Sequence, residues 1–544
     1  MDEIPSKEKG VSHGTNHKDE LQLEATFGIH QEMKRNFSLW SLLFMCCCTS
    51  TTWEALASTM TQALSSGGSS SMVWGFFVSA IGAFLLSLCL GEFSSRIPTA
   101  GGQYHYAAEL CPPKARRVVS WFAGWNTLWG WILITLAGNF ANAMQLQAYL
   151  ILFAPGYEHE RWHTSLILIA LTTLYLAGTS ISNKVLYYTT FWGITFHIIG
   201  YFLTIIYLLV SVKEKQTAKW VFTDQTNYSG WNSGIAWSIG IMSSALSQIG
   251  WDASTHMSEE MKDAARDLPR TMYGAVLITG LTTFPWVIAL MFCMEDIGSV
   301  VNGPAGAMSP LVQLIYNVSG GNMAVTLGVT IPTLALNVVS AGPACLAATS
   351  RLTWSFAREG GLPSFLAKIH PKLNLPLNAI MFDWLLVTLL SLIYIGNETA
   401  FYGLNSGVTV VVILSYALPI FLHIVYGTQH CNLPAGPFTL GKLSIPINYV
   451  ALIWATYLII FLSFPSRLPV TAVNMNYTCL VLAAGIVIPA GLWFAYGNNR
   501  YLGVVHEVSG SREASNLSHH PEVHYADAKA AEYIENNNLK SEIS

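Results

Sequence analysis

The chain has 544 residues, of which 52% are hydrophobic and only 11% are charged, with a net charge of −4 at pH 7. Soluble domains carry about 25% charged residues, so this chain has too few charges to cover the several domains that a soluble protein of this length would form. Its mean hydropathy is +0.42. The composition excludes a basic nucleic-acid-binding protein and indicates an integral membrane protein with the lipid bilayer as its main partner.

Long apolar segments recur along the chain. A helix that crosses a bilayer needs roughly 20 mostly apolar residues. These segments are too long and too apolar for the strands of a membrane barrel, and lipid admits only helices or closed barrels. The sequence predicts an all-α polytopic membrane protein with twelve transmembrane helices. The predicted spans are residues 38–64, 72–92, 119–153, 164–180, 186–210, 235–257, 272–293, 322–350, 378–395, 401–425, 446–464 and 477–496.

Polar segments flank this membrane domain, which is predicted over residues 38–497. Residues 1–37 and 498–544 are rich in Glu, Lys, Ser, Asn and His and are predicted to be disordered tails. No small-residue cleavage site follows the first apolar run, so no removable signal peptide is predicted. If the N-terminus is cytosolic, the inner segments hold 22 of the 27 Lys and Arg residues. The positive-inside rule therefore predicts that both tails are cytosolic.

Glycosylation sequons agree with this orientation. Four N-x-[ST] triplets lie in predicted outer loops and two in predicted inner segments, although chance matches to this pattern are common. The outer triplets begin at Asn227, Asn317, Asn397 and Asn476, and the inner ones at Asn36 and Asn516.

Polar stretches interrupt the first and the sixth predicted spans. Residues 49–58 contain Glu54, and residues 243–256 contain Gly250 and Asp252. Ser and Thr side chains can satisfy backbone groups where a membrane helix breaks. Ionisable groups within spans are costly and mark functional sites by default.

The two stretches share the pattern Trp-acid-Ala, at Trp53-Glu54-Ala55 and Trp251-Asp252-Ala253. Spans one and six begin the two halves of a five-plus-five core. Many transporters place their site at interrupted helices in corresponding positions of two inverted repeats. This pattern predicts a five-plus-five inverted-repeat core with broken helices one and six.

Each polar group within a span also has a structural interpretation. Glu54 is either a counter-charge or proton carrier, or a carboxyl group hydrogen-bonded inside the bundle. Asp252 is either a site residue, or a gate or helix cap on the cytosolic side. His197 in span five can carry a proton or simply pack. Asn139, Asn337 and Ser340 are interpreted as polar contacts between helices.

The sequence gives little support for an enzyme. It contains no GxxxxGK[ST] and no G-x-S-x-G motif, and its one match to HExxH, at residues 159–163, falls in the short loop between predicted spans three and four. We expect no enzyme, no ATP-driven pump, no metal site and no cofactor.

Three loops resemble those of the amino acid–polyamine–organocation superfamily. They comprise residues 92–104 after span two, residues 256–260 with 264–270 after span six, and residues 350–352 with 357–363 after span eight. Within the superfamily the chain is most similar to the fungal choline/GABA/amino-acid permease branch. The resemblance implies alternating access, usually driven by protons, with a central site between broken helices one and six.

The resemblance also implies candidate residues for that site. A Gly-rich break is common in span one of the superfamily, but here the segment is Thr-Ser-Thr-Thr-Trp-Glu. A carboxylate there disfavours an anionic group beside it, so choline or a polyamine gains support as the substrate. Trp53 and Trp251 could add cation–π contacts to such a cation, or they could act as gates or packing groups. The coupling or gating candidates are Glu54, Asp252 and His197. The substrate-binding candidates are Thr51, Thr52, Trp53, Glu54, Gly250, Trp251 and Asp252.

Three functions follow from these patterns. The first is a proton-coupled importer of an amine, choline or amino acid at the plasma membrane. The second is an exporter or vacuolar carrier with the same fold, and the third is a nutrient sensor. A sensor would need a long folded signalling tail, whereas the tails here are short and polar.

Overall fold

The structure is a computed structural model that describes residues 32–33, 35–431 and 433–503. Residues 35–503 form one compact unit, which is the unit discussed below. Residues 35–37 and 498–503 belong to this unit, although the sequence assigns them to the tails. The tail predictions for residues 1–31 and 504–544 lie outside the described residues.

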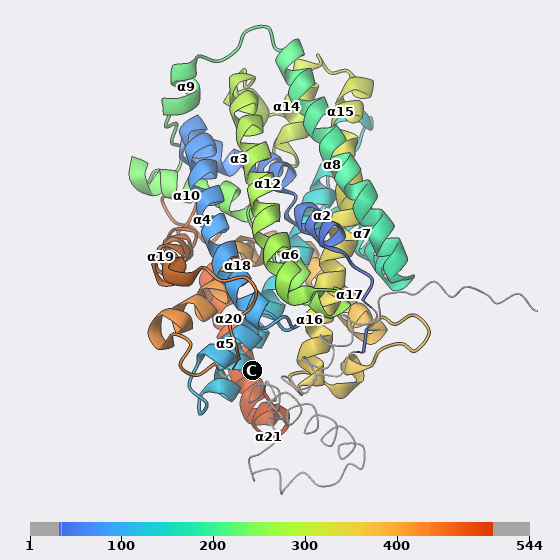
Figure 1. Cartoon of the computed structure of the whole chain (residues 1–544). Helices are drawn as coiled ribbons and strands as arrows, with labels where there is room; N and C mark the ends of the chain where they lie inside the picture. The colour runs from blue at the N-terminus through green and yellow to red at the C-terminus, as the bar shows by residue number, and fades with distance from the viewer. Residues whose placement is uncertain (1–31, 34, 432, 504–544) are drawn as a thin grey trace, which may run out of the picture. The chain divides into compact units, whose positions relative to one another are not determined.

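Helices make up the regular structure of the described residues, with no strand among them apart from two isolated β-bridges. Figure 1 shows their arrangement. The helices are α2 (Leu39–Ser50), α3 (Thr52–Ser66), α4 (Gly68–Arg96), α5 (Gln103–Leu110), α6 (Arg116–Phe153), α7 (Arg161–Ser180), α8 (Asn183–Ser211), α9 (Ala218–Thr223), α10 (Ser233–Leu246), α11 (Ala253–His256), η1 (Ser258–Glu260), α12 (Ala264–Phe292), α13 (Ile297–Val301), α14 (Pro310–Val318), α15 (Met323–Leu336), η2 (Asn337–Ala341), α16 (Gly342–Arg358), η3 (Ser364–Ala367), α17 (Leu377–Gly396), α18 (Glu398–Tyr426), η4 (Gly441–Leu443), α19 (Ser444–Phe461), α20 (Thr478–Leu492), η5 (Trp493–Gly497) and α21 (Asn498–Arg500).

Nine helical segments of the described chain are long and apolar enough to cross a membrane, and each coincides with a predicted span. The other three predicted spans differ in instructive ways. Spans one and six are each divided in two, as α2–α3 and α10–α11. Span three is α6, whose 38 residues would extend roughly 57 Å. The polytopic helical fold predicted from the sequence is confirmed.

Both predicted helix breaks are present. Helix one is interrupted at Thr51, which has the left-handed conformation φ 41° and ψ 45°. Helix six is unwound between Leu246 and Ala253, with Gly250 at φ 85°. A Cβ atom on Gly250 would also lie only 3.2 Å from the Thr49 carbonyl oxygen, so the position suits glycine alone.

The two broken helices lie side by side and run in opposite directions. α3 packs against α10, whereas α2 packs against α11. The hydroxyl group of Thr49 joins the two breaks by donating to the Gly250 carbonyl oxygen at 2.9 Å. The polar residues that flag the breaks in the sequence therefore satisfy the backbone where the helices unwind.

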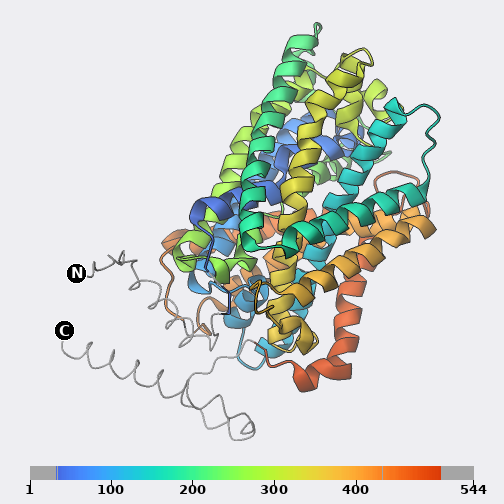
Figure 2. The ribbon, with the colours of Figure 1, turned by 90° about the vertical axis from the view of Figure 1, so that its right-hand side faces the viewer.

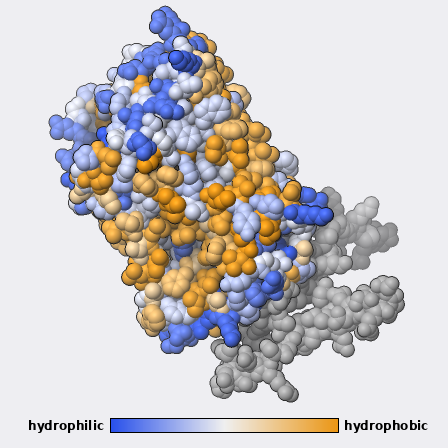
Figure 3. Space-filling model, turned by 90° about the vertical axis from the view of Figure 1, so that its left-hand side faces the viewer, coloured by the Kyte–Doolittle hydropathy of each residue, from blue (hydrophilic) through white to orange (hydrophobic). Residues whose placement is uncertain are grey.

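The helix bundle has two distinct ends. α5 and α21 lie at the end drawn lowest in Figure 1, and α9, α14 and the start of α15 lie at the opposite, upper end. Figure 2 shows the long helices running between these ends. In Figure 3 hydrophobic residues gather across the middle of the face, with hydrophilic residues toward both ends, as expected of a protein that crosses a bilayer.

Burial distinguishes central from peripheral helices. In its most apolar stretch, α18 has 72% of its residues buried inside the protein, but α20 only 17%. Apolar side chains on α20 therefore face lipid. Helix association in lipid depends on close packing rather than on removing apolar surface from water.

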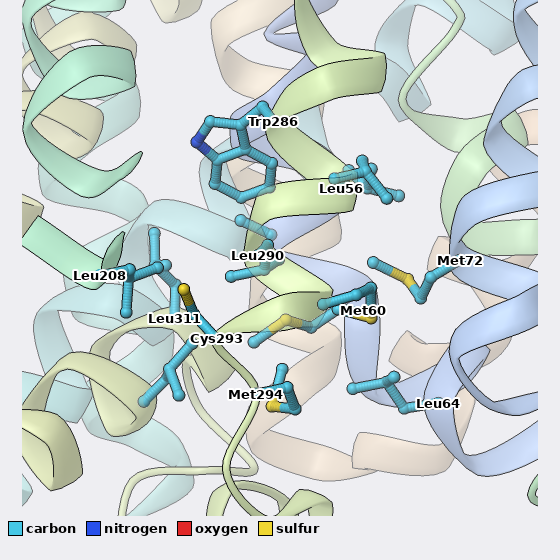
Figure 4. Packing of buried hydrophobic residues seen from close by; sticks show 14 of the residues in the cluster. Leu56, Met60, Leu64, Met72, Leu208, Trp286, Leu290, Cys293, Met294 and Leu311 are labelled. Atoms are coloured by element: carbon cyan, nitrogen blue, oxygen red, sulfur yellow. The ribbon is translucent and has the colours of Figure 1, made fainter. Parts of the chain in front are cut away.

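An apolar cluster holds α3 in place. Figure 4 shows Leu56, Met60 and Leu64 of α3 meeting Met72 of α4 and Leu290 of α12, all fully or almost fully buried. This packing anchors the upper half of broken helix one beside the break that carries Glu54.

Candidate functional site

A cavity of about 240 Å³ lies beside the break in helix one. Its size is at the small end of ligand pockets, which suits a small solute rather than a nucleotide or lipid. Its wall includes residues of the two helix breaks, of the turn before α14, and of the helices α2, α3, α6, α14, α15, α16 and α18. Polar groups on this wall include Ser50, Thr51, Glu54, Ser58, Thr59, Thr135, Asn139, Asn142, Gln145, Ser309, Thr333, Asn337 and Asn405.

Glu54 is the only residue with an acidic or basic side chain among the described residues of this wall. Among the described lining residues, it is the one Asp, Glu, Lys, Arg or His side chain. It lies in the first turn of α3, directly after Thr51, and no side-chain cap satisfies the amides of that turn. The positive end of the helix dipole therefore lies beside the carboxyl group of Glu54.

His197 of α8 contacts Glu54. Its Nδ1 lies 2.7 Å from Glu54 Oε1, and both residues are buried. The other carboxylate oxygen, Oε2, has no hydrogen-bond partner among the described residues. One oxygen of Glu54 is thus engaged with a group that can carry a proton, while the other is left without a protein partner.

Of the predicted site residues around Glu54, some line the cavity and others do not. Thr51 lines the cavity with Glu54, but Thr52 and Trp53 are not among the lining residues. The Trp53 ring is fully buried, 5.2 Å from Trp286 and 6.0 Å from His197 between ring centroids. Trp53 therefore packs behind Glu54, and its predicted role as a substrate contact stays a prediction.

The predicted residues of helix six lie below the cavity rather than on its wall. Trp251 packs on Tyr416 of α18 with ring centroids 4.8 Å apart. Asp252 is fully buried and accepts hydrogen bonds from Tyr416 at 2.5 Å, Gln103 Nε2 at 2.6 Å and Trp131 Nε1 at 3.3 Å. These contacts fasten the break to α18, α5 and α6.

Ion pairs follow nearer the lower end. Arg351 Nε donates to Glu260 at 2.9 Å, and its Nη2 donates to Asn183 at 3.0 Å. Arg358 donates to both oxygens of Glu259, at 2.7 and 3.1 Å. Burial raises the pKa of the Glu260 carboxyl group, and Arg351 opposes that rise. These pairs join α16 to η1 at the lower end.

Several lining residues were not predicted as site residues. Asn139 and Asn337 line the cavity. Asn139 also makes the contact between helices that the sequence predicted, because its side-chain amide donates to the Leu168 carbonyl oxygen of α7 at 2.9 Å. Both asparagines are amides within long apolar spans, which was the available signal. Phe140, Tyr402 and Asn405 also line the cavity, but nothing in the local sequence distinguishes them.

Comparison with known proteins agrees with this architecture. Residues 37–485 match the Amino acid permease family. The chain belongs to that family. It is 31% identical to the choline transporter of Saccharomyces cerevisiae over 490 residues, which cover 89% of this chain and 85% of that protein. It is 28% identical to amino-acid permease 2 of Neurospora crassa, covering 88% of each chain. It is 25% identical to amino-acid permease BAT1 of Arabidopsis thaliana, covering 88% of this chain and 95% of that protein.

Family membership confirms three predictions made from the sequence. The chain is an integral membrane protein, it is a transporter of a small solute, and it is not an enzyme. The helix breaks and the cavity therefore belong to a permease.

Proposed function

We propose that this permease carries a small organic cation, choline or a related amine, by proton-coupled secondary active transport with alternating access. The observation that carries the proposal is Glu54, the single acidic or basic side chain on the described cavity wall, with Oε2 unpartnered. A buried carboxylate without a cation is unfavourable, and a bound cation would compensate it.

A solute that carries its own carboxylate would bind less well. It would place a second negative charge beside Glu54, and no described Lys or Arg lines the cavity to balance it. Phe140 and Tyr402 supply the aromatic faces of the wall, on which a quaternary ammonium group can rest. The choline transporter of Saccharomyces cerevisiae among the relatives supports the same solute class.

The Glu54–His197 pair is the proposed proton carrier. In this proposal the pair takes up the coupling proton, and the cation of the solute lies beside Glu54 Oε2, the oxygen without a described partner. Proton and solute then bind together, which is the requirement for symport. Release of the proton on the side of lower proton concentration then completes the cycle.

The cellular setting is also proposed. The lower end carries Lys114, Arg116 and Arg117 beside α5, and the positive-inside rule places such loops in the cytosol. We infer that both tails are cytosolic, that the upper end faces outward, and that the protein acts in the plasma membrane.

Uptake into proteoliposomes tests the proposal. The panel is choline, putrescine, arginine, GABA and a neutral amino acid, each with and without an inward proton gradient. Choline uptake should exceed that of the amino acids and should rise with the gradient. Unit charges 4 Å apart interact by about 4 kcal/mol at an effective dielectric constant of 20, so Glu54→Gln should weaken choline uptake about tenfold or more.

Matched variants separate the roles. Glu295→Gln removes a carboxylate from an exposed loop at the upper end and should leave uptake unchanged. His197→Gln should retain downhill choline entry but lose the response to the gradient. Preferred uptake of a neutral amino acid, or full choline uptake by Glu54→Gln, would contradict the proposal.

A further inference from the structure

A further carboxyl group is buried in the membrane domain and does not line the cavity. Asp383 belongs to the inward-facing stripe of α17, with Ala379, Ile380 and Val387. It is fully buried and does not line the cavity. Ionisable groups inside membrane spans are costly and therefore call for a functional explanation.

The contacts of Asp383 are made with one neutral hydroxyl group. Thr353 Oγ1 of α16 lies 2.8 Å from Asp383 Oδ1 and 3.0 Å from Oδ2. The two basic residues of the lower half of α16 are engaged elsewhere, Arg351 with Glu260 and Arg358 with Glu259. Among the described residues, no Lys, Arg or His forms an ion pair with Asp383.

The other helices packed against α17 are α6, α7 and α18, together with η3. The titratable side chain on the buried face of α7 is Tyr175, which accepts a hydrogen bond from Asn142 at 2.9 Å. The buried titratable side chains of α18 are Tyr416, which donates to Asp252, and His423, which packs on Phe93. None of these groups forms a described contact with the carboxyl group.

The number of hydrogen atoms available for these two contacts differs between the protonated and the ionised form of Asp383. A hydroxyl group has one hydrogen, so it can donate to only one of two carboxylate oxygens at a time. If Asp383 is protonated, both short contacts have a hydrogen, since Thr353 donates to one oxygen and the acid donates back from the other. An ionised Asp383 would instead be a buried charge with no cation beside it, which is strongly unfavourable.

We propose that Asp383 is a resident proton-binding site: it stays a neutral acid throughout transport and joins α17 to α16 through Thr353. It is a positioning residue, because α16 also carries Arg351 and the cavity-lining Cys345. This proton is distinct from the one that drives transport. The inference depends on the buried geometry and not on the identity of the solute.

Infrared spectroscopy of the purified permease in lipid vesicles tests the site directly. The wild type minus Asp383→Asn difference spectrum should contain the carbonyl stretch of a protonated carboxylic acid. That band should persist from about pH 5 to about pH 9, where an ordinary Asp is ionised. Thr353→Val should shift the band by removing its hydrogen bond, and Asp267→Asn, which alters a half-buried carboxylate, should not affect it.

Transport assays give an independent readout. Asp383→Asn keeps both a donor and an acceptor for Thr353, so uptake should stay within about twofold of wild type, with an unchanged response to the proton gradient. Asp383→Leu removes both and should lower the uptake rate several-fold. A band that is absent, that vanishes when solute or a gradient is added, or that ignores Thr353→Val would overturn the proposal. Loss of gradient coupling in Asp383→Asn would overturn it as well.

Discussion

Tyr416→Phe tests whether the layer around Asp252 closes the lower end. The substitution removes one hydroxyl group, which donates to Asp252 at 2.5 Å, and keeps the ring that packs on Trp251. A hydrogen bond to a charged group contributes about 1.5–3 kcal/mol, which corresponds to a change of roughly ten- to 150-fold in an equilibrium constant. Suppose that the lower end is closed in about 99% of the molecules. A hundredfold change in the equilibrium constant for opening would then lower the closed fraction to about half.

Cys345 is a native reporter for this change, because it lines the cavity. The assay measures its rate of modification by a membrane-impermeant cationic thiol reagent added from the upper side. Cys479 is exposed and Cys431 half-buried, so both are first replaced by Ser. Tyr416→Phe should lower the modification rate, by about 8% for a tenfold change in the equilibrium and by about 2.5-fold for a 150-fold change. Cys345→Ser should abolish labelling, and added choline should slow it.

An unchanged modification rate in Tyr416→Phe would refute the reasoning, provided that Cys345→Ser abolishes labelling. It would show that the hydrogen bond contributes equally to both states. The lower end would then depend on the Arg351 and Arg358 ion pairs instead of on Asp252.

Two predictions concern stability in detergent, measured by thermal unfolding. Gly193→Ala would place a Cβ atom 2.2 Å from Ser340 Cβ, so it should destabilise the protein by about 1–3 kcal/mol, whereas Gly328→Ala has open space and should have little effect. Arg351→Gln leaves Glu260 buried without its cation and should cost about 3–5 kcal/mol, part of which the double variant Arg351→Gln/Glu260→Gln should recover. Equal stability of the single and double variants would contradict the second prediction.

The sequence was informative about spans and breaks because both depend on local chemistry. A run of about 20 apolar residues must be a membrane helix, since lipid offers no partner for the backbone. Clustered Ser and Thr residues with Gly250 mark the points where helices can unwind. The structure places breaks at Thr51 and between Leu246 and Ala253, within the predicted polar stretches.

The lining of the cavity was harder to predict, because it depends on how each helix is rotated. Adjacent residues on a helix point about 100° apart, since one turn takes 3.6 residues. Glu54 consequently faces the cavity while Trp53 packs against Trp286. Tyr402 and Asn405 line the cavity only because α18 packs against α6 in one particular register.

The sequence by itself determined a membrane-spanning helical protein with two interrupted helices and a carboxylate at the first interruption. These features follow from the cost of charge and of unpaired backbone groups in lipid. Only the tertiary structure decided that Glu54 meets His197, that Asp252 lies below the cavity, and that Asp383 faces Thr353. Each of these contacts joins residues far apart in the chain, so packing between helices, and not local pattern, creates it.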